Sequence, residues 1–260
     1  MGKKKHIAIL DTETTHPQQE VFDIAVLIGD LHGNIVFERQ WIIKEKIHQK
    51  LFYEEKRLLY LDRLRNPQYP AKFCTIKVAL SEMEKIFQHF AITEVYAYNM
   101  AFDSRVVGKI ADEYQLSNPL KMREMECLWF WSTQTIFQQK SFPKFCVDNP
   151  ETHLTPKGNY KTSAETCYAY IKKIPDFVEE HTALEDCRIE YEIFLHCRKQ
   201  KKFRCKGIAS NVWLLPQTEE QIEKLPPQFR SMKVNLHNQI ERAEILAKRF
   251  GKKIQVEVGL

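Results

Sequence analysis

Three apolar segments rich in β-branched residues fill most of the first 43 residues, and they constrain the fold more than any other feature. They cover residues 6–10, 21–28 and 35–43. The turn-forming residues His32-Gly33-Asn34 separate the second segment from the third. This spacing predicts buried strands, of which the second and third form an antiparallel hairpin. We therefore expect the chain to open as a β-meander.

Helical and strand patterns alternate in the residues that follow. Apolar residues at helical spacing predict helices over 44–64, 75–90, 104–114, 162–173 and 183–199, and residues 94–98 are typical of a short strand. Prolines 143, 150 and 156 mark residues 141–161 as a long loop. The aromatic residues 129–131 favour core packing over base stacking. Strands that alternate with helices predict an α/β domain with helices packed on a mixed sheet.

Acidic residues stand at three places where hydrophobic burial would not put them. Asp11 and Glu13 follow the first strand two residues apart, so their side chains can point to one face, and strand ends of α/β sheets bind ligands. Asp103 follows the fourth predicted strand, and Asp186 comes five residues after His181 at a helix entrance. Each place also has a simpler explanation, since Asp is common at strand ends and Asp103 can be a helix N-cap.

Taken together, these carboxylates indicate a metal site. Four carboxylates without balancing bases repel one another unless cations neutralise them, and oxygen ligands without thiolates favour Mg²⁺ or Mn²⁺. Two such ions about 4 Å apart activate water and stabilise the leaving oxygen in displacement at phosphorus. A histidine beside them, such as His181, can take the proton from the attacking water. This hypothesis requires the three segments to meet in space.

Three short motifs occur in order along the chain: Asp11-x-Glu13, Asn99-x-x-Phe102-Asp103 and His181-x4-Asp186. They resemble the exonuclease motifs of the DEDDh, or DnaQ-like, family, which includes the proofreading epsilon subunit of bacterial DNA polymerase III, RNase T and oligoribonuclease. The resemblance covers roughly residues 4–200. It implies a ribonuclease H-like fold, with a mixed five-stranded sheet whose first three strands are antiparallel, flanked by helices. It also implies 3′ to 5′ hydrolysis that releases nucleoside monophosphates.

The resemblance further implies a role for each matching residue. Asp11, Glu13 and Asp186 would hold the ion that activates water, Asp11 would bridge to a second ion, and Asp103 would hold that second site. His181 would be the general base. We therefore expect two Mg²⁺ or Mn²⁺ ions in each site. The positions expected near the terminal nucleotide are Thr12, Thr14, Asn99 and Phe102.

The formal net charge of +5 is unevenly distributed. Residues 1–197 hold 25 basic and 28 acidic side chains, whereas residues 198–260 hold 14 and 6. The family resemblance implies a DEDDh exonuclease domain over 1–200, and the charge distribution adds a small basic C-terminal extension over 201–260, helical with a possible edge strand. The extension is expected to contact DNA or a partner such as a polymerase or another replication protein, although basic runs are as often merely solvated.

The seven cysteines include no C-x-x-C pair, which indicates reduced thiols and neither a disulfide framework nor a thiolate zinc site. The basic first residues precede too short an apolar run for a signal peptide, and no segment is long and apolar enough to span a membrane. We therefore expect a cytoplasmic protein, encoded by a bacterium or a phage, with no membrane partner.

The leading functional hypothesis is a metal-dependent 3′–5′ exonuclease that acts on single-stranded or frayed DNA ends. The first alternative is the same chemistry on RNA, because the RNA-specific 2′-hydroxyl contact leaves no sequence signature. The second is a catalytically idle binding module that accompanies a polymerase. The sequence does not distinguish among proofreading, repair and end trimming.

Overall fold

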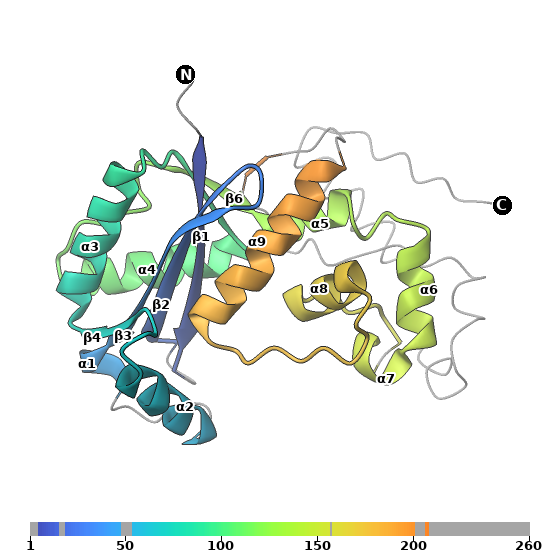
Figure 1. Cartoon of the computed structure of the whole chain (residues 1–260), viewed down its shortest axis with the longest axis horizontal. Coiled ribbons are helices and arrows are strands. Elements are labelled where there is room, and N and C mark those ends of the chain that lie inside the picture. Colours follow the sequence, from blue (N-terminus) through green and yellow to red (C-terminus); the bar gives the residue numbers. More distant parts are fainter. Residues whose placement is uncertain (1–4, 16–18, 48–53, 157, 201–205, 208–260) are drawn as a thin grey trace. The chain divides into compact units, whose positions relative to one another are not determined.

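The computed structural model describes residues 5–15, 19–47, 54–156, 158–200 and 206–207. Among these residues, six strands form one mixed sheet in the order β4-β3-β2-β1-β5-β6 (Figure 1). Strands β1, β2 and β3 are antiparallel, while β4, β5 and β6 run parallel to their neighbours β3, β1 and β5. The strands are β1 (His6–Thr14), β2 (Val21–Asp30), β3 (Ile35–Ile43), β4 (Ala71–Cys74), β5 (Glu94–Ala97) and β6 (Glu124–Cys127).

The sheet has one strand more than the five predicted. The sequence patterns predicted neither β4, which extends the sheet beyond β3 and includes exposed Phe73, nor β6, because strands of four residues are too short to show an alternating pattern. The mixed α/β class, the antiparallel first three strands and the flanking helices are as predicted.

Local hydrogen bonds explain the hairpin between β2 and β3. The Asp30 carboxylate accepts the backbone N–H groups of His32 at 2.8 Å and Asn34 at 3.0 Å. Gly33 takes a φ of 103°, which a residue without a β-carbon adopts at little cost. The turn therefore follows from residues within the turn itself, as the sequence predicted.

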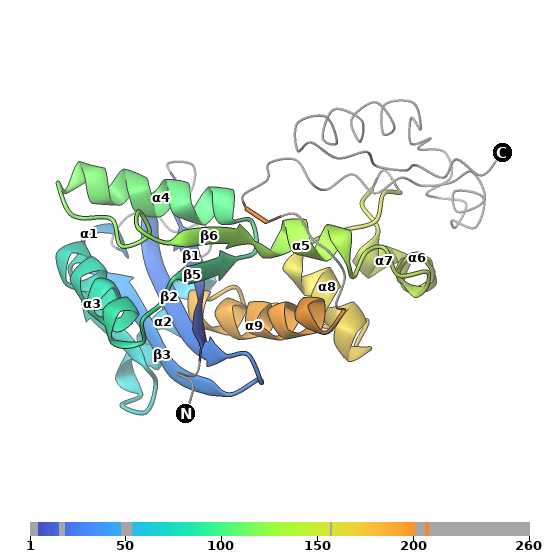
Figure 2. The same ribbon diagram turned by 90° about the horizontal axis from the view of Figure 1, so that it is seen from above.

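The described residues form two compact units. The first comprises described residues up to 128 together with 179–195, and the second comprises 129–178 together with the described residues from 196 onward. The helices of the first unit are α1 (Lys44–Ile47), α2 (Glu54–Arg65), α3 (Ile76–His89), α4 (Met100–Glu113) and the greater part of α9 (Ala183–Lys199). Figure 2 shows α4 and α9 on opposite sides of the sheet.

Helix α9 packs closely on the first two strands. The Sγ of Cys187 lies 3.7 Å from the carbonyl oxygen of Ile9 and 3.5 Å from that of Ala25. A β-carbon at Gly29 would come within 2.4 Å of the Tyr191 ring, so only glycine admits the helix at this point. This packing brings the start of α9 to the end of β1.

The second unit corrects the prediction of a long loop over residues 141–161. Residues 141–153 include α6 (Ser141–Asp148) and α7 (Pro150–His153), and the unit also contains α5 (Leu128–Gln134) and α8 (Ala164–Lys172). Pro150 occupies the first turn of α7, where a missing N–H costs nothing, so this proline begins a helix. The predicted core packing of residues 129–131 is confirmed for Phe130 and Trp131, which are 8% and 7% exposed.

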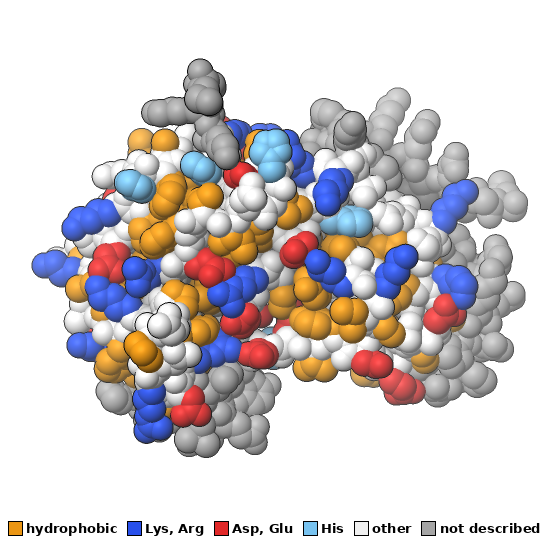
Figure 3. All heavy atoms as spheres, in the orientation of Figure 1, with side chains coloured by type: hydrophobic (Ala, Val, Ile, Leu, Met, Phe, Trp, Pro, Cys, Tyr) orange, Lys and Arg blue, Asp and Glu red, His pale blue; other side chains and the backbone are white. Residues whose placement is uncertain are grey.

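Two further predictions concern chemistry and charge. All six cysteines within the described residues are buried and free of disulfides. Basic and acidic side chains are interspersed over the face in Figure 3, in keeping with the near balance of charge before residue 198.

No helix among the described residues is long and apolar enough to cross a membrane. The predicted extension over 201–260 lies outside the described residues, apart from residues 206 and 207.

Candidate active site

The first part of the site is the end of β1, a central strand with β2 on one side and β5 on the other. Asp11 pairs with Ala25 of β2, and Glu13 pairs with Asp23. Because the side chains of a strand alternate, Asp11 and Glu13 lie on the same face, as predicted. Both are partly buried, next to a register shift between Glu13 and Thr14.

The entrance of α4 supplies the second part. The chain leaves β5 through Asn99, whose φ of 79° is left-handed, and α4 begins at the next residue. Asp103 therefore stands inside the first turn and not at the N-cap, which rules out the simpler explanation of this residue. Its side chain is 3% exposed and accepts a hydrogen bond of 2.8 Å from the Thr12 hydroxyl.

The entrance of α9 supplies the third part. His181 precedes the helix with a left-handed φ of 54°, and the backbone N–H of Asp186 donates to the Thr182 carbonyl at 3.0 Å. The N–H of Ala183, in the first turn, donates to the Asp23 carboxylate of β2 at 3.1 Å. A buried carboxylate of the sheet thus satisfies an N–H group that the start of a helix leaves free.

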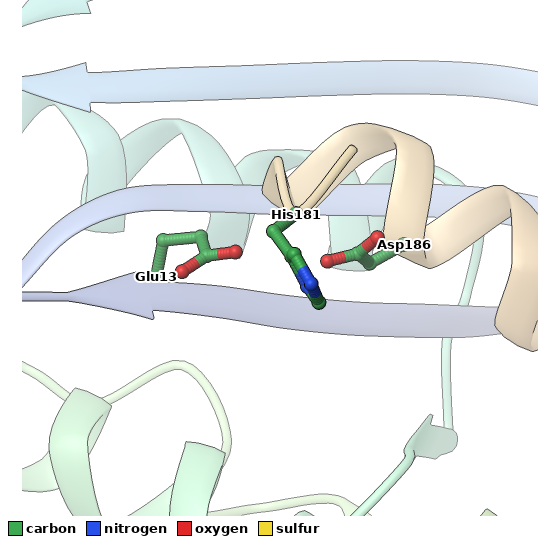
Figure 4. Close-up of side chains that lie close together, drawn as sticks. All are labelled: Glu13, His181 and Asp186. Atoms are coloured by element: carbon green, nitrogen blue, oxygen red, sulfur yellow. The ribbon is translucent and has the colours of Figure 1, made fainter. Parts of the chain in front are cut away.

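The first and third parts meet, as the hypothesis requires. One potential ligand atom each from Glu13, His181 and Asp186 lies within 4.8 Å of the other two (Figure 4). His181 is exposed, whereas Asp186 is only 9% exposed. In Figure 4 the Glu13 side chain extends from β1 and Asp186 from α9, with the imidazole of His181 between them. The cluster therefore combines a solvent-accessible imidazole with two carboxylates.

Electrostatics bring Asp11 and Asp103 into the same group. The pKa of Asp11 lies well above its ordinary value, first because burial penalises the ionised form and then because Asp186 and Glu190 are charged neighbours. The charges of Asp103 and Glu13 raise the pKa of Asp11 further. Burial also raises the pKa of Asp103 to about 7, despite the hydrogen bond from Thr12.

Two acidic residues of the site were missed by the sequence reasoning. Glu190 is 2% exposed and stands one turn after Asp186 on α9, where residues four apart share a face. Burial and the charge of Asp103 hold the pKa of Glu190 well above its ordinary value, while a backbone N–H of Tyr98 donates to it. The second residue, Glu179, places a carboxylate oxygen 3.6 Å from Nδ1 of His181. The spacing of Asp186 and Glu190 is a signal that could have been used.

The chemistry of this donor set fits divalent metal ions. Carboxylate oxygens and one imidazole converge at the site. Each of its acidic side chains makes ionisation of its neighbours less favourable, and these side chains are Asp11, Glu13, Asp103, Asp186 and Glu190. Bound cations would remove that cost, because a positive charge nearby favours the ionised carboxylate. No cysteine in the described part of the chain belongs to the cluster of Glu13, His181 and Asp186, so its donors are of the type that Mg²⁺ and Mn²⁺ prefer.

The four residues expected near the nucleotide border this group. Thr12 is 7% exposed with its hydroxyl bonded to Asp103, and Thr14 is half-buried at the end of β1. Asn99 and Phe102 flank the start of α4, and the Arg105 guanidinium lies 5.1 Å from the centre of the Phe102 ring. Contact of these four residues with the terminal nucleotide stays a prediction.

No protein-family model matches the sequence, and a search of curated proteins finds no match. Solved structures do resemble the fold. A full-length 3′-exonuclease superposes with a TM-score of 0.55 at 11% identity, over 84% of this chain and 92% of that one. A 3′-exonuclease that recognises the 3′ end of a histone mRNA stem-loop gives 0.54 at 11% identity, over 77% and 84%. The nuclease domain of 3′hExo, described as a DEDDh family member bound to rAMP, gives 0.51 at 12% identity, over 80% and 99%.

These identities are too low to transfer an activity, so the likeness concerns the fold. The chain has the ribonuclease H-like fold of DEDDh exonucleases, which confirms the predicted fold class with one additional strand. The motif-bearing segments occupy the end of β1 and the entrances of α4 and α9.

Proposed function

We propose that the chain is a metal-dependent 3′–5′ exonuclease that hydrolyses the terminal phosphodiester bond of a nucleic acid and releases nucleoside monophosphates. The observation that carries the proposal is the convergence of Glu13, His181 and Asp186, whose ligand atoms lie within 4.8 Å of one another. The fold supports it, because 3′-exonucleases are among the solved structures that superpose on this chain.

The proposed ligands are the four aspartate and glutamate residues of the three motifs. Asp11, Glu13 and Asp186 would hold one Mg²⁺ or Mn²⁺ ion, and Asp103, together with Asp11, would hold a second. Bound at these carboxylates, the ions would activate water and stabilise the charge that develops on the attacking and leaving oxygens.

His181 is the proposed general base. Its side chain is 52% exposed, so the imidazole can accept a proton from the attacking water and pass it to solvent. The carboxylate of Glu179, 3.6 Å from Nδ1, favours the imidazolium that results and keeps the other ring nitrogen available for the water. The terminal nucleotide is proposed to contact the backbone of Thr12 and Thr14, together with Asn99 and Phe102.

DNA with a single-stranded or frayed 3′ end is the first proposed substrate, as inferred from the sequence. RNA is the second, and a specific observation favours it: two of the similar structures are described with a histone mRNA stem-loop and with rAMP. The reaction is the same for both polymers. The substrate preference therefore depends on contacts to the sugar, which a direct comparison can measure.

The test incubates the full chain with matched DNA and RNA oligonucleotides labelled at the 5′ end, in Mg²⁺, in Mn²⁺ and in a chelator. We expect stepwise shortening from the 3′ end, release of nucleoside monophosphates and complete inhibition by the chelator. Asp11→Asn should abolish shortening. Asp62→Asn, which changes an exposed aspartate on α2, is the matched control and should retain activity.

Equal trace release by the wild type and Asp11→Asn would instead support the catalytically idle binding module. Faster shortening of RNA than of DNA would assign RNA as the substrate. Contact of the basic extension over 201–260 with nucleic acid or with a polymerase remains a proposal, as do a cytoplasmic location and a bacterial or phage origin. Loss of salt-dependent binding after removal of residues 201–260 would support phosphate contact by the extension.

A further inference from the structure

One arginine of α2 contacts the residues on both sides of His181. Arg63 donates hydrogen bonds to the Glu180 carboxylate and to the Thr182 hydroxyl. The Arg63 side chain is 12% exposed, so most of it is removed from water. No part of the three motifs contains Arg63, and sequence reasoning assigned it no role.

Helix α2 is fixed to the core of the first unit close to this arginine. Tyr60, one turn before Arg63, is 1% exposed and belongs to a buried cluster with Phe22 and Ile42. The rings of Phe22 and Tyr60 are edge-to-face with centroids 5.4 Å apart. Residues three apart on a helix share a face, so the anchored side of α2 is the side that presents Arg63.

The guanidinium is itself held in place. It lies 4.9 Å from the centre of the Tyr69 ring and donates to the Tyr69 hydroxyl at 2.7 Å. Tyr69 follows the end of α2 by four residues. A planar guanidinium can stack on a ring and donate in several fixed directions at once, which a lysine ammonium cannot do. Arg63 thus connects an anchored helix to residues 180 and 182.

His181 needs such support for two reasons. Its φ of 54° is left-handed, a conformation that is unfavourable for a residue with a β-carbon. Its side chain is 52% exposed, so packing covers only part of the ring. The orientation of the imidazole therefore depends in part on the backbone that carries it, and Arg63 contacts that segment on each side of the histidine.

We propose that Arg63 is a positioning residue for His181: it holds the segment 180–182 in the conformation that places the imidazole beside Glu13 and Asp186. This inference rests on the proposed function, since it takes His181 as the general base. Helix α2 then contributes to catalysis through Arg63 alone, which acts through His181.

The first experiment compares kcat for Arg63→Ala, Arg63→Lys and the control Arg65→Ala, an exposed arginine of the same helix that pairs only weakly with Asp62. A small displacement of a catalytic group costs about 10²-fold, so we expect Arg63→Ala to lower kcat by about ten- to a hundredfold with little change in KM. Arg63→Lys should restore little of the loss, and Arg65→Ala should behave like the wild type.

A double-mutant cycle separates positioning from general destabilisation. In the His181→Ala background the Arg63→Ala change should no longer lower kcat, because its effect passes through the imidazole. An equal loss with and without His181 would overturn the proposal. Should Arg63→Ala fail to fold, Thr182→Val removes one acceptor while leaving Arg63 and Tyr69 in place, and it is expected to lower kcat in the same His181-dependent way.

A readout without activity distinguishes this inference from the proposed function. Amide hydrogen exchange at residues 179–183 should accelerate in Arg63→Ala and stay unchanged in Arg65→Ala, whereas Mn²⁺ affinity measured by calorimetry should not change in either variant. Unchanged exchange in Arg63→Ala would overturn the positioning role even in an active enzyme. If exchange is faster in Arg63→Ala than in the wild type but the wild type has no nuclease activity, only the proposed function is overturned.

Discussion

The two helices that carry the site's aspartates begin alike but are held differently. Each starts after a residue with left-handed φ, Asn99 before α4 and His181 before α9. At α4 the following aspartate is 3% exposed and bonded to the central strand through Thr12. At α9 the histidine is exposed, and contacts from Arg63 and Asp23 hold the residues around it. The first entrance is part of the core, whereas the second combines an exposed histidine with contacts from outside its own segment.

The largest expected effect is a loss of kcat of the same size at the entrances of α4 and α9. Asp103→Asn and Asp186→Asn each remove a proposed metal ligand, and each should raise the activation free energy by about 4 kcal/mol or more, a loss in kcat of about 10³-fold. Single-turnover assays with saturating Mn²⁺ measure the loss. A variant that kept a tenth of wild-type activity would remove that aspartate from the proposed ligand set.

The same pair of variants should differ in stability when metal is absent. The pKa of Asp103 is raised to about 7 from an ordinary value near 4. A raised pKa in the folded state means that the folded protein loses stability as the pH rises between these two values. Asp103→Asn retains an acceptor for Thr12 and removes this titration, so it should be more stable than the wild type at about pH 8 and nearly equal at about pH 4.

Urea unfolding in a chelator at both pH values checks this prediction. We expect a difference of roughly 1–4 kcal/mol between the variant and the wild type at the higher pH, because one pKa unit corresponds to about 1.4 kcal/mol. Addition of Mn²⁺ should stabilise the wild type more than the variant. A wild type that is equally stable across this pH range would contradict the buried, uncompensated carboxyl group at the entrance of α4.

The next largest effect on kcat concerns only the entrance of α9, where His181 is exposed. His181→Ala should lower kcat by about 10²–10⁴-fold, the usual contribution of a general base. Because His181 is proposed as a base, its removal should leave Mn²⁺ affinity nearly unchanged, whereas Asp186→Asn should weaken it. Calorimetric titration of both variants makes the comparison. Equal loss of metal affinity in the two would show the imidazole to be a ligand instead.

The two entrances also show how far sequence reasoning extends. The strand over residues 35–43 and the helix from about residue 183 to residue 199 were predicted correctly, because long apolar patterns have a clear period. The four-residue strand β4 offers too few positions for any period. Residues of the three motifs were found from their types and spacing, and the meeting of Glu13 with Asp186 depends on long-range packing that no local pattern contains.

The supports of the site were harder still to predict. Arg63 acts on residues more than a hundred positions away in the chain, and its partners are identified only when α2 is placed against the start of α9. Asp23 was seen as part of a buried strand, yet it accepts from Ala183. Glu190 shares a helix face with Asp186, but its burial among carboxylates depends on the strand and helix opposite.

Glu190 allows the buried side of the α9 entrance to be tested separately. Glu190→Gln removes a like charge while keeping an oxygen that can accept from Tyr98, so the pKa of Asp11 should fall toward its ordinary value. Loss of a nearby negative charge should weaken Mn²⁺ binding by about ten- to a hundredfold, as for other groups around metal sites. Glu192→Gln, a half-buried position on the same helix, is the control. Unchanged affinity in Glu190→Gln would place this carboxyl outside the electrostatic range of the ions.

The smallest expected effect concerns the backbone of the α4 entrance. Asn99 has a φ of 79° and makes no side-chain hydrogen bond to the N-terminal N–H groups of α4, so its contribution to stability comes from its tolerance of this conformation. Asn99→Gly should change the free energy of unfolding by only about 0.5 kcal/mol, since glycine adopts positive φ readily. Asn99→Ala should cost about 1–2 kcal/mol, because its β-carbon meets the following carbonyl in the left-handed region. Both values are measurable by urea unfolding in a chelator. If Gly and Ala proved equally destabilising, the role of Asn99 would lie in its side chain, and the entrance of α4 would resemble that of α9 in depending on specific contacts.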